Sequence, residues 1–377
     1  MSSVKSAVRK DVIRSAWVAF AAAVMFNHAG GRRRPRFTWA VIALAGVLVS
    51  SCGSAIDPAH AKAARDVESI LGQMPGVHRT SITIGDNFSG LVVLTEEASV
   101  DQINTVIKTF HDWTAAAPEL QGLRADIEVR RRDEKSSFKV GKHGFATAAD
   151  HTAQWHALSH AFPEDELRWT YQWSTHLRRG YGPDDTISEG ADGVGDIALN
   201  LDHAGEFKVV GDAYRRLMRD FPELSNAAWQ IKTSAPESGL LQIGHRYPTE
   251  LELSVWDRLN ADQNPAHKVL MHLKSTPSRE PAWPDVIERL QSRDFQDAKM
   301  LAEKHIPIVA ELLAQFPATT ELGSRGVSYL ASSDPRDSLA SYHHDRGLRI
   351  TLGNCHIGDD PPTPAELPLV KRYGVTC

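Results

Sequence analysis

Four segments of the chain share one pattern of apolar residues followed by proline. They are Ile70-x3-Met74-Pro75, Leu158-x3-Phe162-Pro163, Leu217-x3-Phe221-Pro222 and Leu312-x3-Phe316-Pro317. Apolar residues four apart lie on one helix face, and a proline disfavours helix in the residue before it. Each motif therefore predicts the last buried turn of a helix.

Two strand-like segments follow each motif. They are "SITIG" and "GLVVLTE", "LRWTYQW" and "DIALNLD", "AAWQIKT" and "GLLQIGH", and "GVSYLAS" and "GLRITLG". In the third, Trp169, Tyr171 and Trp173 alternate with polar residues, which is typical of a strand with one solvated face. The repeated unit is thus helix, strand, strand.

Two weaker copies of this unit fall in the gaps. The helical "SVDQINTVIKTFHDW" precedes "LRADIEVRR" and "SSFKVGK", and "TELELSVWDRLN" precedes "HKVLMHLKS" and a doubtful strand near "DVIERLQ". Six units pair into three αββαββ modules, at 62–145, 149–247 and 248–354. We expect an α+β protein whose modules are two-layer sandwiches, each with helices on one face of an antiparallel sheet. The αββαββ order resembles a circular permutation of the ferredoxin-like βαββαβ sandwich, and also small domains of bacterial envelope proteins.

Residues 1–51 read as an export signal. Four arginines, at 32–34 and 36, precede an uncharged run from Phe37 to Ser51. This run is shorter than the roughly 20 residues that a membrane-spanning helix needs, and a basic segment followed by a short apolar one is typical of a secretory signal. Met25 lies close before the arginines and is a candidate for the true start.

The signal ends in Val49-Ser50-Ser51-Cys52, which resembles the lipobox of bacterial lipoproteins of the actinobacterial type. The resemblance implies cleavage before Cys52 and lipid on its sulfur, with a linker over 52–61 and the mature chain on the outer face of the cell membrane. Val49 stands where that family usually has leucine. A plain signal peptide, or an uncleaved anchor helix with an incidental cysteine, is the alternative.

The chain has three cysteines, so a pair remains once Cys52 is assigned to lipid. Cys355 and Cys377 enclose a proline-rich tail, 355–377. In an oxidising compartment we expect this pair to form a disulfide, which contributes on the order of 3 kcal/mol. Two free thiols are the alternative.

Charge separates the leader from the rest of the chain. The net charge is −5, whereas residues 1–51 contain eight basic residues and one acidic residue, which leaves the body at about −12. This balance argues against a nucleic-acid partner or an anionic lipid surface. We expect the acyl chains to be the sole membrane contact.

Histidines and acidic residues offer candidate metal ligands. The helical segment "DHTAQWHALSH" places His156 and His160 four residues apart, with His151 one to two turns earlier. This spacing suits zinc if the side chains converge, although solvated surface histidines are the alternative. "YHHDRG" is a second candidate, or a loop between the last two strands. The acidic "GPDDTISEGADGVGD" suits calcium by its oxygen ligands but lacks the EF-hand spacing, and a solvated loop between strands is the alternative.

Trp169, Tyr171 and Trp173 are candidate binding residues. If they lie on the sheet face without helices, they form an aromatic groove for an apolar or glycan ligand, and exposed aromatics there would mark an interface. Core packing is the alternative.

The sequence contains no G-x-S-x-G, H-E-x-x-H, P-loop or G-x-G-x-x-G pattern. We therefore favour a non-enzymatic, lipid-anchored envelope protein that binds or scaffolds an envelope protein or glycan, with no cofactor. The alternative is an extracytoplasmic metal-binding protein or hydrolase that uses His151, His156 and His160.

Overall fold

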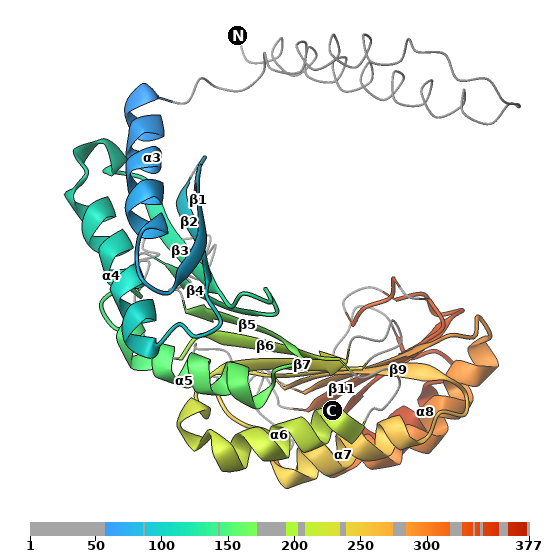
Figure 1. Ribbon diagram of the computed structural model, residues 1–377. Helices are drawn as coiled ribbons and strands as arrows, with labels where there is room; N and C mark the ends of the chain where they lie inside the picture. Colours follow the sequence, from blue (N-terminus) through green and yellow to red (C-terminus); the bar gives the residue numbers. More distant parts are fainter. Residues whose placement is uncertain are drawn as a thin grey trace, which may run out of the picture. The chain divides into compact units, whose positions relative to one another are not determined.

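All twelve strands of the described chain lie in one sheet, in chain order from β1 to β12 (Figure 1). The computed structural model describes residues 57–85, 87–141, 144–171, 194–202, 208–233, 239–273, 284–316, 326–334, 336–339, 342–353 and 361–374. Residues 57–377 form one compact unit, and the leader falls in a separate one.

The strands are β1 (Val77–Ile84), β2 (Asn87–Leu94), β3 (Arg124–Arg130), β4 (Ser136–Gly141), β5 (Glu166–Tyr171), β6 (Asp196–Leu201), β7 (Ala228–Thr233), β8 (Leu240–Ile243), β9 (His267–Leu273), β10 (Asp285–Leu290), β11 (Val327–Ser332) and β12 (Gly347–Leu352). The helices are α3 (Pro58–Gly72), α4 (Val100–Ala116), α5 (Ala148–Ala161), α6 (Lys208–Asp220), α7 (Glu250–Ala261), α8 (Phe295–Val309) and α9 (Leu367–Tyr373). Short 3₁₀ helices follow α4, α6 and α8, at Pro118–Leu120, Pro222–Leu224 and Ala310–Ala314.

The six helix-strand-strand units are confirmed, including the doubtful strand, which is β10. The two strands of each unit pair antiparallel, whereas the last strand of one unit pairs parallel with the first strand of the next. Each of the helices α4 to α8 therefore connects two adjacent parallel strands.

Permuted ferredoxin-like sandwiches are not confirmed. A ferredoxin-like fold contains split βαβ units, in which another strand lies between the two that the helix connects. Here the connected strands are direct neighbours, and the sheet continues through the expected module boundaries because β4 pairs with β5 and β8 pairs with β9. The chain is α+β, with one continuous mixed sheet.

Helices α3 to α8 lie along one face of the sheet (Figure 1). Strand side chains alternate between the two faces, so every second residue enters the core under the helices. On β4, Phe138 and Val140 are fully buried, and the Phe138 ring stacks on Trp155 of α5 at 5.9 Å. Between them, Lys139 points to the opposite face, which we call the open face.

Three of the four proline motifs end a helix with a buried leucine, as predicted: Leu158, Leu217 and Leu312 are fully buried. The first motif differs, because Ile70 is 39% exposed and its neighbour Leu71 is buried instead. Helix α3 is the first of the row, so it has a neighbouring helix on one side only, which leaves part of its surface in solvent.

The first and last expected segments also differ from the structure. Residues 58–61, expected to belong to a linker over 52–61, lie in α3, which begins at Pro58 and is capped by the Asp57 carboxylate accepting from the Ala59 amide at 2.8 Å. The tail contains the short helix α9, which contacts β12. The leader with Cys52, and the pair Cys355 and Cys377, lie outside the described residues. Within the described residues, none of the helices combines the length and apolar composition needed to cross a membrane.

Candidate metal centre

Three polar side chains meet in the core between the C-terminal part of the sheet and the helix α8 that covers it. His267 begins β9, Glu288 lies in β10 and His305 lies in α8, and their exposed fractions are 1%, 0% and 1%. In the β9–β10 pairing His267 faces Leu290, which places Glu288 at the diagonal position on the same face. His305 reaches the same cluster from α8, on the helix face that also buries Leu301.

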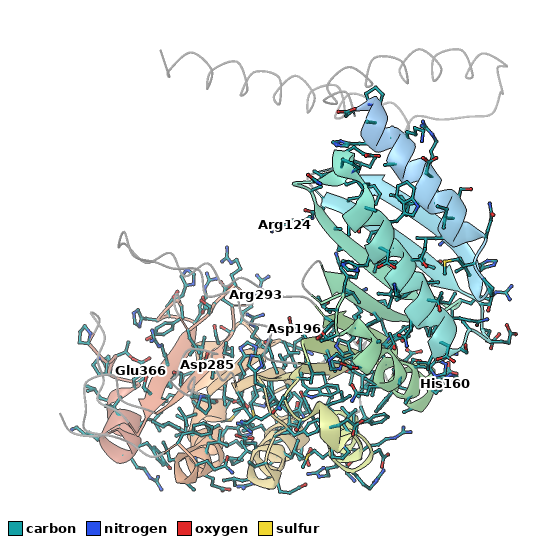
Figure 2. The ribbon with its side chains drawn as sticks, turned by 90° about the vertical axis from the view of Figure 1, so that its left-hand side faces the viewer. Arg124, His160, Asp196, Asp285, Arg293 and Glu366 are labelled. Atoms are coloured by element: carbon teal, nitrogen blue, oxygen red, sulfur yellow. The ribbon has the colours of Figure 1, made fainter. Side chains whose placement is uncertain are left out.

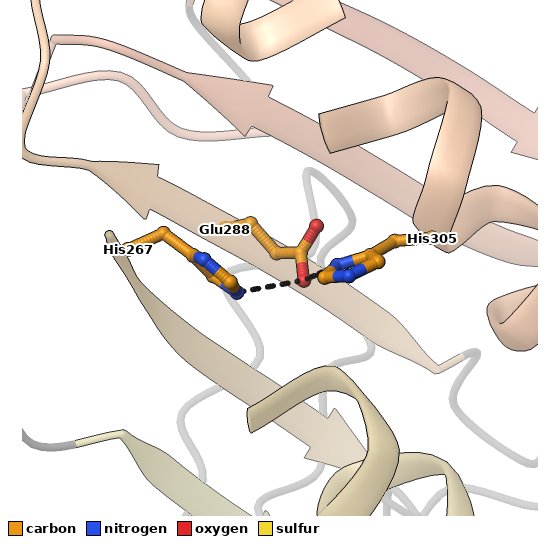
Figure 3. Close-up of side chains that lie close together, drawn as sticks. All are labelled: His267, Glu288 and His305. Atoms are coloured by element: carbon orange, nitrogen blue, oxygen red, sulfur yellow. Dashed lines mark hydrogen bonds and ion pairs between the residues drawn. The ribbon is translucent and has the colours of Figure 1, made fainter. Parts of the chain in front are cut away.

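The two imidazoles flank one carboxylate oxygen (Figure 3). His305 Nδ1 lies 2.7 Å from Glu288 Oε1, and His267 Nε2 lies 3.4 Å from the same oxygen. One donor atom from each of the three residues lies within 4.8 Å of the other two. These donors could therefore surround a single small cation.

A second set of groups contacts the other nitrogen of each imidazole and the other oxygen of the carboxylate. His267 Nδ1 lies 2.8 Å from the Pro265 carbonyl oxygen, and the Tyr329 hydroxyl donates to Glu288 Oε2. His305 Nε2 lies 3.5 Å from Asp262 Oδ2, which also pairs with Lys304 Nζ at 2.8 Å. The ring and carboxylate orientations are thus fixed from outside the cluster.

The electrostatics favour an ionised carboxylate. Burial raises the pKa of Glu288, but the two nearby imidazoles, His267 and His305, outweigh burial and leave this pKa below its usual value. Burial lowers the pKa of His267, whereas the nearby Glu288 carboxylate raises it more, so the net pKa is raised. Burial and then the nearby Glu288 raise the pKa of Tyr329, which keeps it a hydrogen-bond donor. The centre therefore combines a fixed negative charge with two nitrogen donors.

Two imidazole nitrogens and a carboxylate oxygen suit Zn²⁺ and related divalent transition metals. With each of these residues at most 1% exposed, a substrate could not reach the cluster without opening the core. The geometry suits holding an ion in place rather than turning over a substrate.

The structure brings two of the three predicted histidines together and separates the third. His156 Nε2 lies 3.4 Å from His160 Nε2 on α5. His151 instead packs against Tyr171 with the rings tilted by 56° and their centroids 4.5 Å apart, and it pairs with Gln154 at 2.9 Å. Burial, followed by the charges of His160 and Arg131, lowers the pKa of His156. Of the described residues, the three-donor groups that could hold a metal include none of these histidines.

The aromatic candidates belong to the core. Trp169 and Tyr171 are 1% and 8% exposed and lie beneath α5 rather than on the open face, which agrees with the core-packing alternative. Trp169 Nε1 donates to the Val194 carbonyl at 2.7 Å, and the Tyr171 hydroxyl lies 2.6 Å from Thr147 Oγ1. Trp173 and all but the end of the acidic loop lie outside the described residues.

The "YHHDRG" segment lies in the connection between β11 and β12, as the loop alternative predicts. His343 Nδ1 lies 2.7 Å from Asp337 Oδ1, and Ser332 donates to Asp337 Oδ2 at 2.6 Å. Asp334 nearby accepts from Arg336 and Arg346 at 2.8 and 3.0 Å. The two arginines already balance the charge of Asp334. The group Asp334, Asp337 and His343 is therefore a weaker candidate for a cation site than the buried group His267, Glu288 and His305.

Sequence reasoning missed the buried centre because its members are far apart in the chain. A local search for histidines at helical spacing finds "DHTAQWHALSH" and passes over His267 and His305. Glu288 offered the one available signal: it occupies an inward position between Val286 and Leu290 of a strand, where an acid without partners would be costly.

Comparisons of the chain with protein-family models, with curated proteins and with solved structures give no match.

Proposed function

We propose that this chain is a non-catalytic, lipid-anchored protein of the cell envelope that binds or scaffolds another envelope protein through its open face. The αββ units would act in pairs, as modules at 62–145, 149–247 and 248–354. The observation that carries the proposal is the set of polar side chains on the open face of β3 to β7, among them Asp126, Glu128, Arg130, Lys139, Arg168, Asn200 and Lys232.

These side chains pair with one another, both between neighbouring strands and along one strand. Asp126 accepts from Ser89 at 3.1 Å and pairs with Lys139 at 3.2 Å. Arg130 Nε pairs with Glu128 at 2.7 Å. The face carries both signs of charge, so its charge pattern suits a polar protein partner with complementary charges better than a polymer of one sign.

The same pattern continues farther along the sheet. Glu166 pairs with Arg168 and accepts from Asn200 at 3.2 Å. Asp196 and Asp285, labelled in Figure 2, begin β6 and β10 on the side of the sheet away from the helices. A surface of this kind, set on a rigid sheet, fits recognition by many modest polar contacts.

The position of Cys52 supports anchoring. Asp57, which caps α3, follows that cysteine by five residues. A lipid on Cys52 would keep the sheet near the membrane. Fractionation of cells that express the full chain tests this directly: we expect the protein in the membrane fraction, released by detergent and not by salt, with a diacylated Cys52 at the mature N-terminus. Recovery of an intact leader, or of an unmodified Cys52 thiol, would overturn the anchor.

Photo-crosslinking tests the binding face. A photoreactive amino acid at Thr170, on the open face, should give an adduct with one envelope protein in intact cells. The matched control is Lys108 on α4, whose side chain is 75% exposed on the helical side. Equal adducts from both positions, or none from Thr170, would contradict the proposal. An adduct that resists protease and yields to a glycan hydrolase would assign the face to a glycan instead.

A further inference from the structure

The buried histidines leave two nitrogens without hydrogen-bond partners. His267 Nε2 and His305 Nε2 are both fully enclosed and make no hydrogen bond. An unpartnered buried polar atom is costly, and such atoms in a folded protein call for a physical reason. The reason differs for the two rings.

For His267, the Pro265 carbonyl fixes the tautomer. A carbonyl oxygen only accepts, so the proton of the neutral ring lies on Nδ1, 2.8 Å from Pro265 O. The Nε2 lone pair of that neutral ring then points at Glu288 Oε1, 3.4 Å away, although the carboxylate is also electron-rich. Only a positive charge on the ring or between the two atoms makes this arrangement favourable.

For His305, an acceptor lies on the opposite side of the ring. His305 Nδ1 lies at hydrogen-bond distance, 2.7 Å, from Glu288 Oε1, and Asp262 Oδ2 lies 3.5 Å from Nε2. With the ring proton on Nε2, toward Asp262, Nδ1 offers its lone pair to a cation held between it and Glu288 Oε1. Each ring thus has one nitrogen facing an outer acceptor and one facing Glu288.

We propose that His267 Nε2, His305 Nδ1 and Glu288 Oε1 are ligands of one divalent metal ion, with Zn²⁺ as the preferred ion. The nitrogens bind through lone pairs, so any proton that they carry is released to solvent, and no electron transfer is involved. The outer contacts to Pro265 and Asp262 are those that metal-ligating histidines usually make through their second nitrogen. Tyr329 supplies the same support for the carboxylate.

The ion links two strands and a helix. Its ligands come from β9, β10 and α8, so metal binding adds to the stability of this part of the fold. The role is structural and independent of the open face.

The first experiment measures metal content. The full chain, purified in detergent without a histidine tag and stripped with chelator, is dialysed against excess Zn²⁺ and then against buffer, and zinc is counted by mass spectrometry. We expect one Zn²⁺ per chain, loss of that ion in Glu288→Gln, and affinity about 10- to 100-fold weaker in Tyr329→Phe. The matched control is His156→Gln with His160→Gln, which removes the exposed histidine pair and should keep the ion.

Two results would overturn the proposal. One is no stoichiometric zinc in the unmodified chain. The other is zinc that is lost from the His156/His160 variant and kept in Glu288→Gln, which assigns the metal to the surface pair. If Glu288→Gln does not fold, the His156/His160 variant decides: zinc should raise its melting temperature and chelator should reverse the rise, whereas an unchanged melting temperature would refute the site.

Discussion

Glu366 accepts a hydrogen bond from the backbone amide of Arg349, at 2.8 Å. A side chain from the C-terminal segment therefore satisfies an amide of β12, the last strand of the sheet. Glu366 is 1% exposed and also accepts from the Thr363 amide and hydroxyl and from the Tyr342 hydroxyl, at 2.8, 2.9 and 2.9 Å. Unpaired strand edges favour aggregation, so this carboxylate helps to close one end of the sheet.

Glu366→Ala should destabilise the protein and expose the β12 edge. The change removes all four hydrogen bonds and leaves the Arg349 amide without its partner, which we expect to cost about 2–4 kcal/mol in the free energy of unfolding. Urea denaturation measures this cost, and light scattering detects association through the edge. Glu303→Ala is the control, since its carboxylate is 58% exposed and 3.9 Å from Lys299. Equal losses in the two variants would show that Glu366 does not support the edge.

Gly195→Ala should destabilise more than Gly122→Ala. Both glycines have positive φ, +88° and +96°, so both substitutions carry a similar backbone strain. At Gly195 the new Cβ would lie 2.4 Å from the Thr170 carbonyl oxygen, whereas at Gly122 nothing lies within 4 Å. We expect about 1 kcal/mol at Gly122 and several at Gly195, because the β5–β6 pairing must shift. Equal melting temperatures for the two variants would contradict the close approach at Gly195.

Asp334 should contribute to stability at neutral pH and lose this contribution in acid. Hydrogen bonds from Arg336 and Arg346, with the charge of Arg336, hold the pKa of Asp334 well below its usual value. Its folded pKa is thus lower than its unfolded pKa of about 3.9, so the stabilisation is complete above about pH 5 and disappears as the pH falls through the folded value.

Asp334→Asn tests this dependence. We expect the variant to be less stable at pH 7 and to lose less stability than the unmodified chain between pH 4 and pH 2, measured by denaturant titration at each pH. Asp345→Asn is the control, because its carboxylate is 77% exposed and lies 3.9 Å from Arg346. A pH profile unchanged in Asp334→Asn would show that other acids determine the acid response.

The sequence predicts the repeated unit well and the assembly of units less well. Apolar spacing identifies eleven of the twelve strands, because each of these alternates or is continuously apolar over a short run, and leaves β10 doubtful. Apolar spacing does not predict the pairing between modules. The strands β4 and β5 form a parallel pair connected by a helix, as β2 and β3 do within a module, so no sequence pattern marks a boundary there. The one doubtful strand, β10, is the strand that carries Glu288, whose inward charge interrupts the apolar pattern.

The candidate site shows the same division. Local spacing brings His156 and His160 together, as expected for residues four apart on a helix. It cannot place His267 beside His305, because strand pairing and the packing of α8 on the sheet decide their contact. Tyr171 likewise enters the core because the face that its strand turns toward the helices is set by the whole sheet.

The final prediction compares two arginine–glutamate pairs that differ mainly in burial. Arg246 donates through both terminal nitrogens to Glu252, at 2.7 and 2.6 Å, and Glu252 is completely buried. One terminal nitrogen of Arg258 donates to both carboxylate oxygens of Glu311, at 2.8 and 2.7 Å, but both side chains are more than 40% exposed.

Arg246→Ala should cost about 3–5 kcal/mol, because it leaves a buried carboxylate without its countercharge. Arg258→Ala should cost at most about 1 kcal/mol, since water solvates the exposed Glu311. Urea denaturation of both variants at pH 7 gives the comparison. The double variant Arg246→Ala with Glu252→Gln should recover part of the loss, because the uncompensated charge is gone while the introduced amide oxygen can still accept from the Thr249 amide that Glu252 caps at 2.8 Å. If the double variant is no more stable than Arg246→Ala, lost packing rather than the stranded charge causes the effect.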